Sequence, residues 1–447
     1  MKLPEKAPSL HADILSKQQE LAQELLKLMS NAQGLIQKAN SEYMYWDDLK
    51  YQPMPKGLSS EEAWFLLKMS RIIQMRSISL NDSNGKQFGY WLPDSVLREI
   101  HFIDQQAGGS ILVDDPAVHS EEKRRYMIRS IVDEAISSSQ IEGAVTTRVV
   151  AKEMLRTGRR PKDRSEQMIH NNYLSMQMIK KHLDEPLSIE LILQIHASMT
   201  KDTLDDPTWA GRFRTPDDEA INVYDSDGQT ILHVPPQAAH VHELMENMCN
   251  YANSDREAEF VNPLIKGILL HFWLAYVHPF MDGNGRTARA LFYWYMLKHR
   301  YWLFEFLSVS TAILSARAQY YRSFIYSEMD DNDATYFLVY NLSAIHRAIE
   351  KLNAYIERKQ KEKKHAYRFA IKYPLLNFRQ RTLLASALEK PDELFTIETH
   401  ARIHGVTYQT ARTDLLTLKD IKLLDIRKQG KKFVFTAPDD LAKKLER

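Results

Sequence analysis

The chain has 447 residues, of which 44% are hydrophobic and 26% charged, and its formal net charge is +1. This length exceeds what one compact domain usually holds, so two or three domains are expected. The single cysteine, Cys249, excludes an intramolecular disulfide and a zinc site built from several cysteines. No stretch approaches the roughly 18 apolar residues of a membrane helix, and the first residues lack the apolar core of a signal peptide. We therefore expect a cytoplasmic protein with no membrane partner.

Residues 1–120 are predicted to form a helical N-terminal extension. Apolar residues such as Ile14, Leu21 and Leu35 recur at helical spacing between residues 9 and 40. Ser60, which two glutamates follow, is a candidate N-cap for the next helix. A turn and a short strand are expected between residues 81 and 91.

Residues 121–356 are predicted to be mainly helical, with one interruption. Helical patterns cover residues 121–182 and 188–204. The sequence INVYDSDGQTILHVPP then places two β-prone runs, residues 221–224 and 230–234, around Asp-Ser-Asp-Gly, which predicts a β-hairpin. Helical patterns resume at residues 238–254, 263–277, 287–297, 312–326 and 335 to about 364.

Residues 357–447 form a predicted third domain with a charge balance of its own. From Lys361 to Arg447 there are 19 Lys and Arg against 11 Asp and Glu, a net charge of +8, so the rest of the chain is close to −7. A helix near residues 379–389 precedes two short helices separated by Gly405, and two β-runs follow around a basic turn. Helix, helix, helix, hairpin is the order of a winged helix-turn-helix domain.

The densest group of chemically active residues is HPFMDGNGRTAR, from His278 to Arg289. An apolar helix is predicted to end before it, and another to begin at Arg286. Gly283 and Gly285 permit a loop whose amide N–H groups point at a bound anion. The start of the next helix adds the positive end of its dipole. The backbone alone therefore predicts an anion site.

The side chains of the same stretch indicate a nucleotide phosphate. Arg286 and Arg289 are three residues apart on one helical face, so both can reach one polyanion. Asn284 can donate a side-chain hydrogen bond, and Asp282 offers a hard oxygen ligand to Mg²⁺. His278 lies at the edge of the loop as a candidate general base.

Two other interpretations of the stretch compete. The sequence GNGRTA fits the dinucleotide pattern GxGxxA, with Glu305 about 20 residues further on. That motif needs a strand leading into Gly283, whereas a helix-length apolar run and a His-Pro step precede it. A glycine-rich turn with a purely structural role would leave the histidine, the aspartate and the two arginines together unexplained.

HPFMDGNGRTAR matches in full the signature of the Fic family, H-P-F-x-[D/E]-G-N-G-R-x-x-R, so the chain resembles that family. The resemblance extends from about Glu134 to about Leu342. It implies a helical-bundle core with a β-hairpin flap. It also implies transfer of the AMP part of ATP, with Mg²⁺, to a hydroxyl side chain of a target protein. The target is not identified by the sequence, and the chain itself is one candidate.

The resemblance also implies a role for each residue of the motif. His278 would deprotonate the target hydroxyl, and Asp282 would hold Mg²⁺. The α- and β-phosphates would lie on Gly283, Asn284 and Gly285. Arg286 would bind near the β-phosphate and Arg289 would bind the γ-phosphate. The predicted hairpin would be the flap that pairs with an extended target segment, through Ile221, Asn222, Val223 and Tyr224.

A second motif lies on the helix that begins the core. Its apolar stripe, at Ile128, Ile131 and Ala135, continues at the same spacing to Ser138 and Glu142. The last turn of this helix therefore points a hydroxyl and a carboxylate at whatever the helix packs on. A solvated helix end would be the ordinary interpretation of these two residues taken alone.

The resemblance changes that interpretation. Ser138, Glu142 and Gly143, a natural C-cap, match the family's inhibitory motif [S/T]-x-x-x-E-[G/N], placed N-terminal to the active site. There the glutamate pairs with the second arginine, here Arg289, and takes the place of the γ-phosphate. In some Fic proteins of this arrangement the same glutamate positions a water that removes AMP. Removal of AMP and use of another nucleotide or a phosphocholine donor are therefore alternatives.

The C-terminal domain has its own candidate partner. Gln409, Thr410 and Arg412 face outward near the start of the second short helix, where a recognition helix contacts bases. Lys428, Lys431 and Lys432 would lie on the wing near phosphates. A DNA-binding regulator with a self-modifying Fic core is thus the rival to an enzyme that modifies other proteins. A winged helix used for protein contacts or for a homodimer is the third option.

Overall fold

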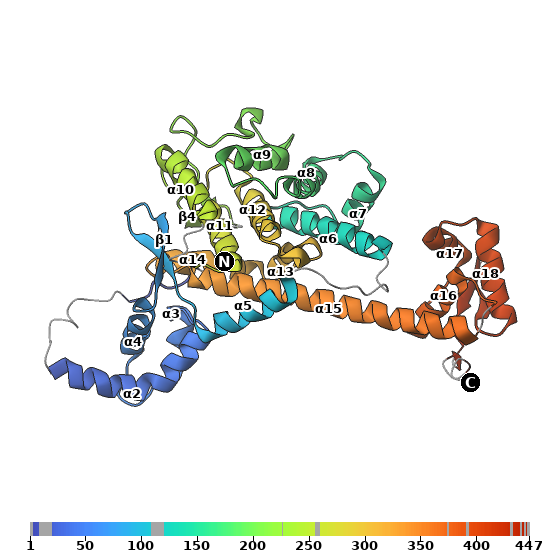
Figure 1. The fold of residues 1–447 in the computed structure, drawn as a ribbon, viewed down its shortest axis with the longest axis horizontal. Helices are drawn as coiled ribbons and strands as arrows, with labels where there is room; N and C mark the ends of the chain where they lie inside the picture. The colour runs from blue at the N-terminus through green and yellow to red at the C-terminus, as the bar shows by residue number, and fades with distance from the viewer. Residues whose placement is uncertain are drawn as a thin grey trace. The chain divides into compact units, whose positions relative to one another are not determined.

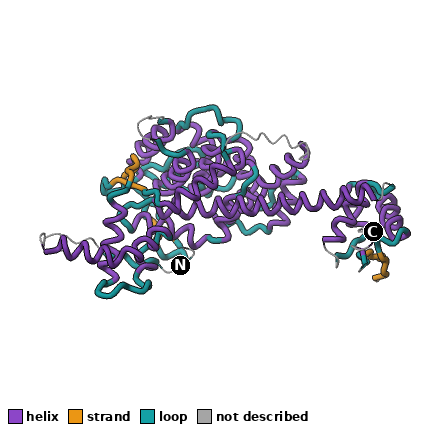
Figure 2. The backbone as a smooth tube through the Cα atoms, turned by 60° about the horizontal axis from the view of Figure 1, so that its bottom comes forward, coloured by secondary structure: helices purple, strands orange, loops and turns teal. Residues whose placement is uncertain are grey.

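The computed structural model describes residues 3–8, 20–108, 120–225, 227–254, 260–372, 375–389, 393–429, 432–438, 440–441 and 444. The chain divides into two compact units, Met1–Glu350 and Lys351–Arg447. Both are mainly α-helical, as expected, with short strands between helices (Figures 1 and 2). The finer division at residues 120 and 356 stays a prediction. No helix in these ranges is both long and apolar enough to cross a membrane.

The N-terminal part of the first unit holds the following elements: α2 (Glu20–Ser41), α3 (Trp46–Leu49), α4 (Ser60–Ile72), β1 (Arg76–Asn81), β2 (Gln87–Tyr90) and α5 (Asp94–Ala107). Ile14 and the start of the first predicted helix lie outside the described residues. The predicted cap at Ser60 is wrong by one residue. The Ser59 hydroxyl accepts from the Glu62 amide while the Glu62 carboxylate accepts from the Ser59 amide, which is a capping box.

The rest of the first unit contains α6 (Ser120–Ile141), α7 (Arg148–Thr157), α8 (Arg164–Ile179), α9 (Ile189–Thr200), η1 (Pro207–Trp209), β3 (Val223–Tyr224), β4 (Ile231–His233), η2 (Ala238–His240), α10 (Val241–Asn253), α11 (Pro263–Val277), α12 (Asn284–Lys298), η3 (Trp302–Glu305), α13 (Val309–Ser315) and α14 (Arg317–Met329). Helix α15 (Thr335–Lys372) begins in this unit and continues beyond residue 350.

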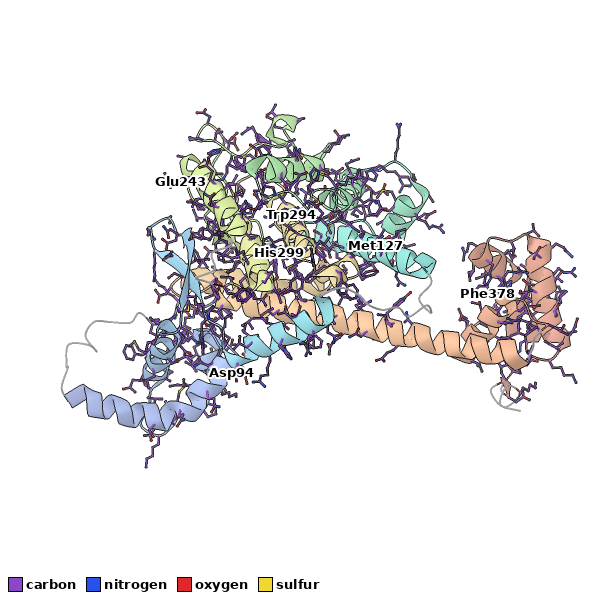
Figure 3. The ribbon with its side chains drawn as sticks, viewed as in Figure 1. Asp94, Met127, Glu243, Trp294, His299 and Phe378 are labelled. Carbon is purple, nitrogen blue, oxygen red and sulfur yellow. The ribbon has the colours of Figure 1, made fainter. Side chains whose placement is uncertain are left out.

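Helices α11 and α12 form the centre of the first unit, with α6, α8, α9 and α10 around them (Figure 1). Helix α11 is apolar on every side, and nearly all of its residues are buried. A Cβ at Gly267 would lie 2.8 Å from the Met296 sulfur, so glycine lets α11 and α12 approach closely. Trp294 of α12 is fully buried within the unit (Figure 3), and its indole N–H donates to the carbonyl of His182. This pair of helices fixes the loop between them.

Three predictions about the core need correction. The predicted helix over 312–326 is two helices, because the backbone of Ala316 leaves the helical region between α13 and α14. The flap strands are shorter than predicted and pair antiparallel, Val223 with His233, so Ile221 and Asn222 lie outside the strand. The strands are short because β3 and β4 form a two-stranded sheet, and no further strand pairs with them among the described residues. On α6, Ile128 is 42% exposed, and the apolar face that packs on α8 includes Val132 and Ile136 instead.

Buried polar groups tie the N-terminal part to the start of α15. The Arg71 guanidinium is fully buried and donates to the hydroxyl of Tyr336, at 2.9 Å, and to the side chain of Asn40 and two carbonyls of the extension. Lys68 forms a buried ion pair with Asp330 at 2.8 Å. Strand β2 adds backbone hydrogen bonds to Asn332 and Ala334. The extension is therefore part of the first unit.

The second unit contains α16 (Phe378–Glu389), α17 (Ile397–His404), α18 (Tyr408–Asp420) and the antiparallel strands β5 (Asp425–Gln429) and β6 (Lys432–Thr436). The predicted order of elements is found. Gly405 ends α17 with a left-handed backbone, and Thr407 caps α18. The buried Asp414 of α18 accepts from Arg379 at 2.7 Å and from Asn377 and His400. This carboxylate links all three helices.

The network around Arg71 predicts the effect of a single change. Arg71→Ala leaves the Tyr336 hydroxyl, Asn40 and two carbonyls without their donor, so the first unit should lose about 3 kcal/mol of unfolding free energy. All seven tryptophans lie in the first unit, so tryptophan fluorescence in urea measures that unit alone. The exposed Arg98→Ala is the matched control. Equal stability of the two variants would contradict the anchoring role of Arg71.

Candidate active site

His278 ends α11 with a left-handed backbone, φ 49° and ψ 58°, which turns the chain out of the helix. Its Nδ1 lies 3.1 Å from the carbonyl of Ala275. A carbonyl only accepts, so Nδ1 carries the proton and Nε2 keeps its lone pair. Burial lowers the pKa of His278 to about 4, so the ring is neutral at pH 7. The neutral tautomer has the form that a general base needs.

The end of α11 is held by an arginine that the sequence did not single out. Arg214 donates from Nε to the carbonyl of His278 at 2.8 Å, and from Nη2 to the carbonyls of Val277 and Pro236. The carbonyls of Val277 and His278 lack helical donors because α11 ends there. Arg214 lies 64 residues away in sequence, so no local pattern indicated this contact.

The loop before α12 is closed by the Asn284 side chain. Its amide oxygen accepts from the Phe280 N–H at 2.9 Å, and its NH₂ donates to the Phe280 carbonyl at 2.7 Å. The sequence predicted a side-chain donor at Asn284, and in the structure both polar atoms of this side chain bond the loop. Asn284 can therefore offer an anion its backbone N–H, as the first residue of α12.

Position 283 requires glycine, because the backbone conformation and the space there exclude a side chain. Its φ is +84°, and a Cβ there would lie 2.5 Å from the Thr200 methyl group and 3.3 Å from Nε2 of His196. The His196 ring is fully buried and stacks on Phe280 at 3.7 Å. Its Nδ1 accepts from the Gly211 N–H, so Nε2 donates to the carbonyl of Asp282 at 2.9 Å. His196 is thus a second residue that supports the loop and that sequence reasoning missed.

The two motif arginines differ in what they contact. Arg286 is almost fully buried, donates to the carbonyl of Met199 at 3.3 Å, and its Nε finds no hydrogen-bond acceptor among the described residues. Arg289 is held by Ser138, whose hydroxyl and carbonyl accept from Nε at 2.9 Å and from Nη2 at 2.8 Å. The third nitrogen, Nη1 of Arg289, lies 2.9 Å from Oε1 of Glu142. The structure therefore brings Ser138, Glu142 and Arg289 together.

Helix α6 ends so that Glu142 reaches this place. The amide of Gly143 donates to the carbonyl of Gln140, and that of Ala144 to the carbonyl of Ser139, which is a Schellman motif. Gly143 takes the left-handed position with φ +93°. Glu142 is the residue just before it, so its side chain leaves the helix at a defined angle. The predicted C-cap role of Gly143 agrees with this geometry.

The Glu142 carboxylate lies over the first turn of α12. A Cβ added at Gly285 would be 2.3 Å from Oε1 of Glu142 and 3.2 Å from Nη1 of Arg289. Glu142 is 30% exposed, whereas Arg289 is 2% exposed. Nη1 of Arg289 has no well-aligned hydrogen-bond acceptor, so the contact is an ion pair without good hydrogen-bond geometry. A carboxylate thus occupies the place where the helix start favours an anion.

A further buried carboxylate supports this end of α6. Glu134 accepts from the hydroxyl of Tyr293 at 2.9 Å and from the hydroxyl of Ser308 and the amide of Ser310. Burial raises its pKa although these hydrogen bonds oppose the shift. Burial disfavours the charge on Arg289 more than any single neighbour favours it, but Glu142, Tyr320 and Glu134 together raise the pKa of Arg289. The guanidinium is therefore charged and available to an anion.

Asp282, the predicted metal ligand, is 45% exposed at the edge of the loop. Its Oδ2 lies 3.4 Å from Arg164, and its Oδ1 lies 3.6 Å from Arg286 and accepts from the Gly283 amide. No group of three or more His, Cys, Asp or Glu side chains suited to a metal occurs in the described part of the chain. One exposed carboxylate still suits Mg²⁺, which takes few protein ligands when phosphates and waters complete its shell.

Other polar residues near the site have structural roles. His271 is buried, and its Nε2 lies 2.9 Å from the Tyr320 hydroxyl, so both belong to the core. His233 of the flap is bonded to Glu328 and to the carbonyl of Tyr276, each at 2.7 Å. Helix α11, and not a strand, precedes Gly283, so the dinucleotide interpretation is wrong.

Comparison with known proteins agrees with the motif. Residues 186–296 match the Fic/DOC family. The chain is 30% identical over 161 residues to the protein adenylyltransferase Fic of Nematostella vectensis, a match that covers 34% of each chain. It is also 30% identical over 159 residues to the protein adenylyltransferase fic-1 of Caenorhabditis elegans, a match that covers 36% of this chain and 27% of that protein. The chain thus spans about a third of the length of these relatives.

One solved structure supports the fold. A fragment of Fic-1 from C. elegans superposes with a TM-score of 0.50 and 21% sequence identity, over 72% of this chain and 84% of that chain. At this identity the likeness concerns the fold.

The buried histidine beside the site predicts a change in acid stability. Burial lowers the pKa of His271 to about 3, below the ordinary 6.5. Between these values the unfolded chain binds one more proton, so this residue costs about 1.4 kcal/mol of stability for each pH unit that the pH falls. His271→Gln removes that contribution. Urea unfolding followed by tryptophan fluorescence at pH 4.5 and 6.5 measures it. If the unfolding free energy of His271→Gln fell between pH 6.5 and 4.5 as much as that of the wild type, this prediction would be contradicted. The exposed His242→Gln is the control.

Proposed function

We propose that this protein, which carries a Fic/DOC domain, transfers AMP from ATP to a hydroxyl side chain of a target protein, and that Glu142 restrains this activity. One observation carries the proposal. The Glu142 carboxylate lies at the start of α12 against Arg289, above Gly285, in a site shaped for an anion. This site contains its own anion, Glu142, together with the neutral His278 and the exposed Asp282. Such a combination suits phosphate transfer under regulation.

The transfer step follows from the state of His278. Its Nε2 lone pair accepts the proton of the target hydroxyl, since Nδ1 faces the Ala275 carbonyl. The hydroxyl oxygen forms a bond to the α-phosphorus while the bond to the bridging oxygen breaks, and pyrophosphate leaves. Arg214, which holds the His278 carbonyl, keeps the base at the end of α11.

The phosphates would be bound mainly by backbone and arginine. The free amides of the first turn of α12, at Asn284, Gly285 and Arg286, provide the cradle. Arg289 would take the γ-phosphate once Glu142 leaves. Asp282 would hold Mg²⁺, which supplies positive charge between the phosphates.

Restraint then follows from competition. While Glu142 holds Arg289, a bound nucleotide lacks its γ-phosphate anchor and its α-phosphorus is displaced from the base. A displacement of about 1 Å can cost a hundredfold in rate. Ser138 contacts the other two nitrogens of Arg289, so it positions the guanidinium in either state.

A second function is proposed for the second unit, where the solvent face of α18 is polar. Gln409, Arg412 and Thr413 are exposed on this face, while Ala411, Leu415 and Leu418 face the core. Lys428 is exposed on β5, whereas Lys431 lies outside the described residues. Such a face suits binding of DNA in a major groove. The proposal of a DNA-binding regulator therefore rests on Arg412 and its neighbours.

The restraint predicts the labelling of proteins in a lysate with α-³²P-ATP. Glu142→Gly should incorporate about a hundred times more AMP than the wild type. The double variant Glu142→Gly with His278→Ala should label no more strongly than the wild type. Gln140→Gly places the same helix-weakening glycine in the same turn and is the matched control. Equal labelling with and without His278 would refute its role as base.

The same proteins decide between addition and removal of AMP. A target labelled by Glu142→Gly keeps its label in the presence of wild-type protein if restraint is the main role of Glu142. Release of the label by the wild type, and not by Glu142→Gly, would instead assign removal of AMP to this residue.

The DNA proposal predicts binding that weakens with salt. Neutralisation of phosphates releases counterions, so the logarithm of affinity should fall linearly with that of salt concentration. Arg412→Ala should weaken binding about tenfold if this residue contacts a base, whereas the exposed Arg160→Ala of the first unit should not. A gel shift with genomic fragments measures both. Absence of binding at low salt would leave protein contact as the role of the unit.

A further inference from the structure

A groove beside the flap has no role in the chemistry described so far. It encloses a cavity of about 330 Å³, lined by Asp82–Ser83 from the turn between β1 and β2, by residues 231–234, and by Tyr276, Glu328 and Asn332. The N-terminal extension, the flap and the helical core each supply one wall. The groove therefore exists only because the extension is part of the first unit.

The groove is adjacent to the proposed base. His233, on its wall, donates from Nε2 to the carbonyl of Tyr276 at 2.7 Å, and Tyr276 is two residues before His278. His233 is 8% exposed in its side chain and also bonds Glu328, so this wall is firmly held. A segment that lies in the groove would pass close to the hydroxyl acceptor position.

The flap offers the groove a free strand edge. Strand β4 pairs only with β3 in the sheet that the described residues form. Four consecutive residues of β4 and its continuation line the cavity, so the backbone as well as alternate side chains border it. Ile231 and Val234 are 44% and 66% exposed. An extended segment can add to such an edge by backbone hydrogen bonds.

The negative charge of the groove favours a ligand that carries a positive charge. Its lining contains two carboxylates, Asp82 and Glu328, and no lysine or arginine. Although burial opposes it, hydrogen bonds from Asn332 and two backbone amides lower the pKa of Asp82, so it is ionised. Glu328 is hydrogen-bonded to Nδ1 of His233, so these two side chains hold one proton between them. Whether or not that ring is charged, the lining keeps a net negative charge.

One cation beside the groove already has a partner. Lys86, at the end of the β1–β2 turn, forms an ion pair with Asp331 and is not part of the lining, although its charge also helps to lower the pKa of Asp82. Nothing in the lining therefore neutralises both carboxylates. A cationic side chain brought by a ligand would do so, and its apolar stem would lie along the exposed Ile231 and Val234.

We propose that this groove binds a lysine or arginine of the target protein, within a few residues of the hydroxyl that accepts AMP. This inference rests on the proposed function and names the class of its substrate: an extended segment with a basic residue beside the acceptor. Glu328 and Asp82 are then specificity-determining residues, and the N-terminal extension takes part in the choice of target. Apolar and acidic segments are the alternatives that the test distinguishes.

The test begins with Glu142→Gly in a lysate, where mass spectrometry locates each AMP-modified residue. Lysine or arginine should be enriched within about four residues of these sites, because strand residues are about 3.3 Å apart. A peptide made from the strongest site then serves as substrate. Adding Glu328→Gln should raise its KM about fivefold, with kcat and the KM for ATP unchanged. The exposed Glu246→Gln is the matched control.

A second peptide completes a double-mutant cycle. Replacing its basic residue by methionine should raise the KM by a similar factor with Glu328 present, and by little with Glu328→Gln. Gln keeps an acceptor for His233, so the wall of the groove is preserved.

Two results would overturn the inference. One is that basic residues are not enriched near the modified sites; the other is that Glu328→Gln leaves the KM for the peptide unchanged. Failure of the proposed function has a different signature. In that case Glu142→Gly incorporates no AMP into any protein, which refutes the groove as a substrate site and the transfer reaction together.

Discussion

The ion pair between Glu142 and Arg289 is the contact on which the rest of the site depends. It joins the end of α6 to the first turn of α12, where the helix dipole and free amides favour an anion. Ser138 holds the other side of the guanidinium, and Glu134 supports the same region through Tyr293. The chain thus builds a site that favours an anion and places its own carboxylate there. In the proposed enzyme, activity depends on how readily ATP displaces that carboxylate.

Residues far apart in sequence maintain this geometry. Arg214 holds the carbonyls at the end of α11, and His196 holds the carbonyl of Asp282 beside Gly283. Asn284 closes the loop between them with both of its amide atoms. His278 and the start of α12 are therefore fixed by hydrogen bonds to the backbone, which leaves the side chains of Arg289 and Asp282 as the parts that can change partner. The N-terminal extension adds a wall beside the flap.

Local patterns in the sequence predicted what local forces decide. The apolar helix over 263–277, the second motif at Ser138 and Glu142, and the element order of the second unit are all found. The sequence did not predict Arg214, His196 or Glu134, because their partners lie tens of residues or more away and the tertiary fold alone brings them together. The partner of the Asn284 side chain was not predicted for a similar reason: both of its polar atoms bond the backbone of Phe280. The apolar stripe through Ile128 was misplaced, since α6 packs on α8 through Val132 and Ile136.

The claim that Glu142 and the γ-phosphate compete for Arg289 can be measured directly. Isothermal titration of ATP and ADP into the wild type and Glu142→Gln compares nucleotides that differ only in the γ-phosphate. Loss of the competing charge should raise the affinity for ATP relative to ADP, by about tenfold if one charge-assisted contact of about 1.4 kcal/mol is gained. An unchanged ratio of the two affinities would contradict the account, because Arg289 would then bind Glu142 without excluding the γ-phosphate.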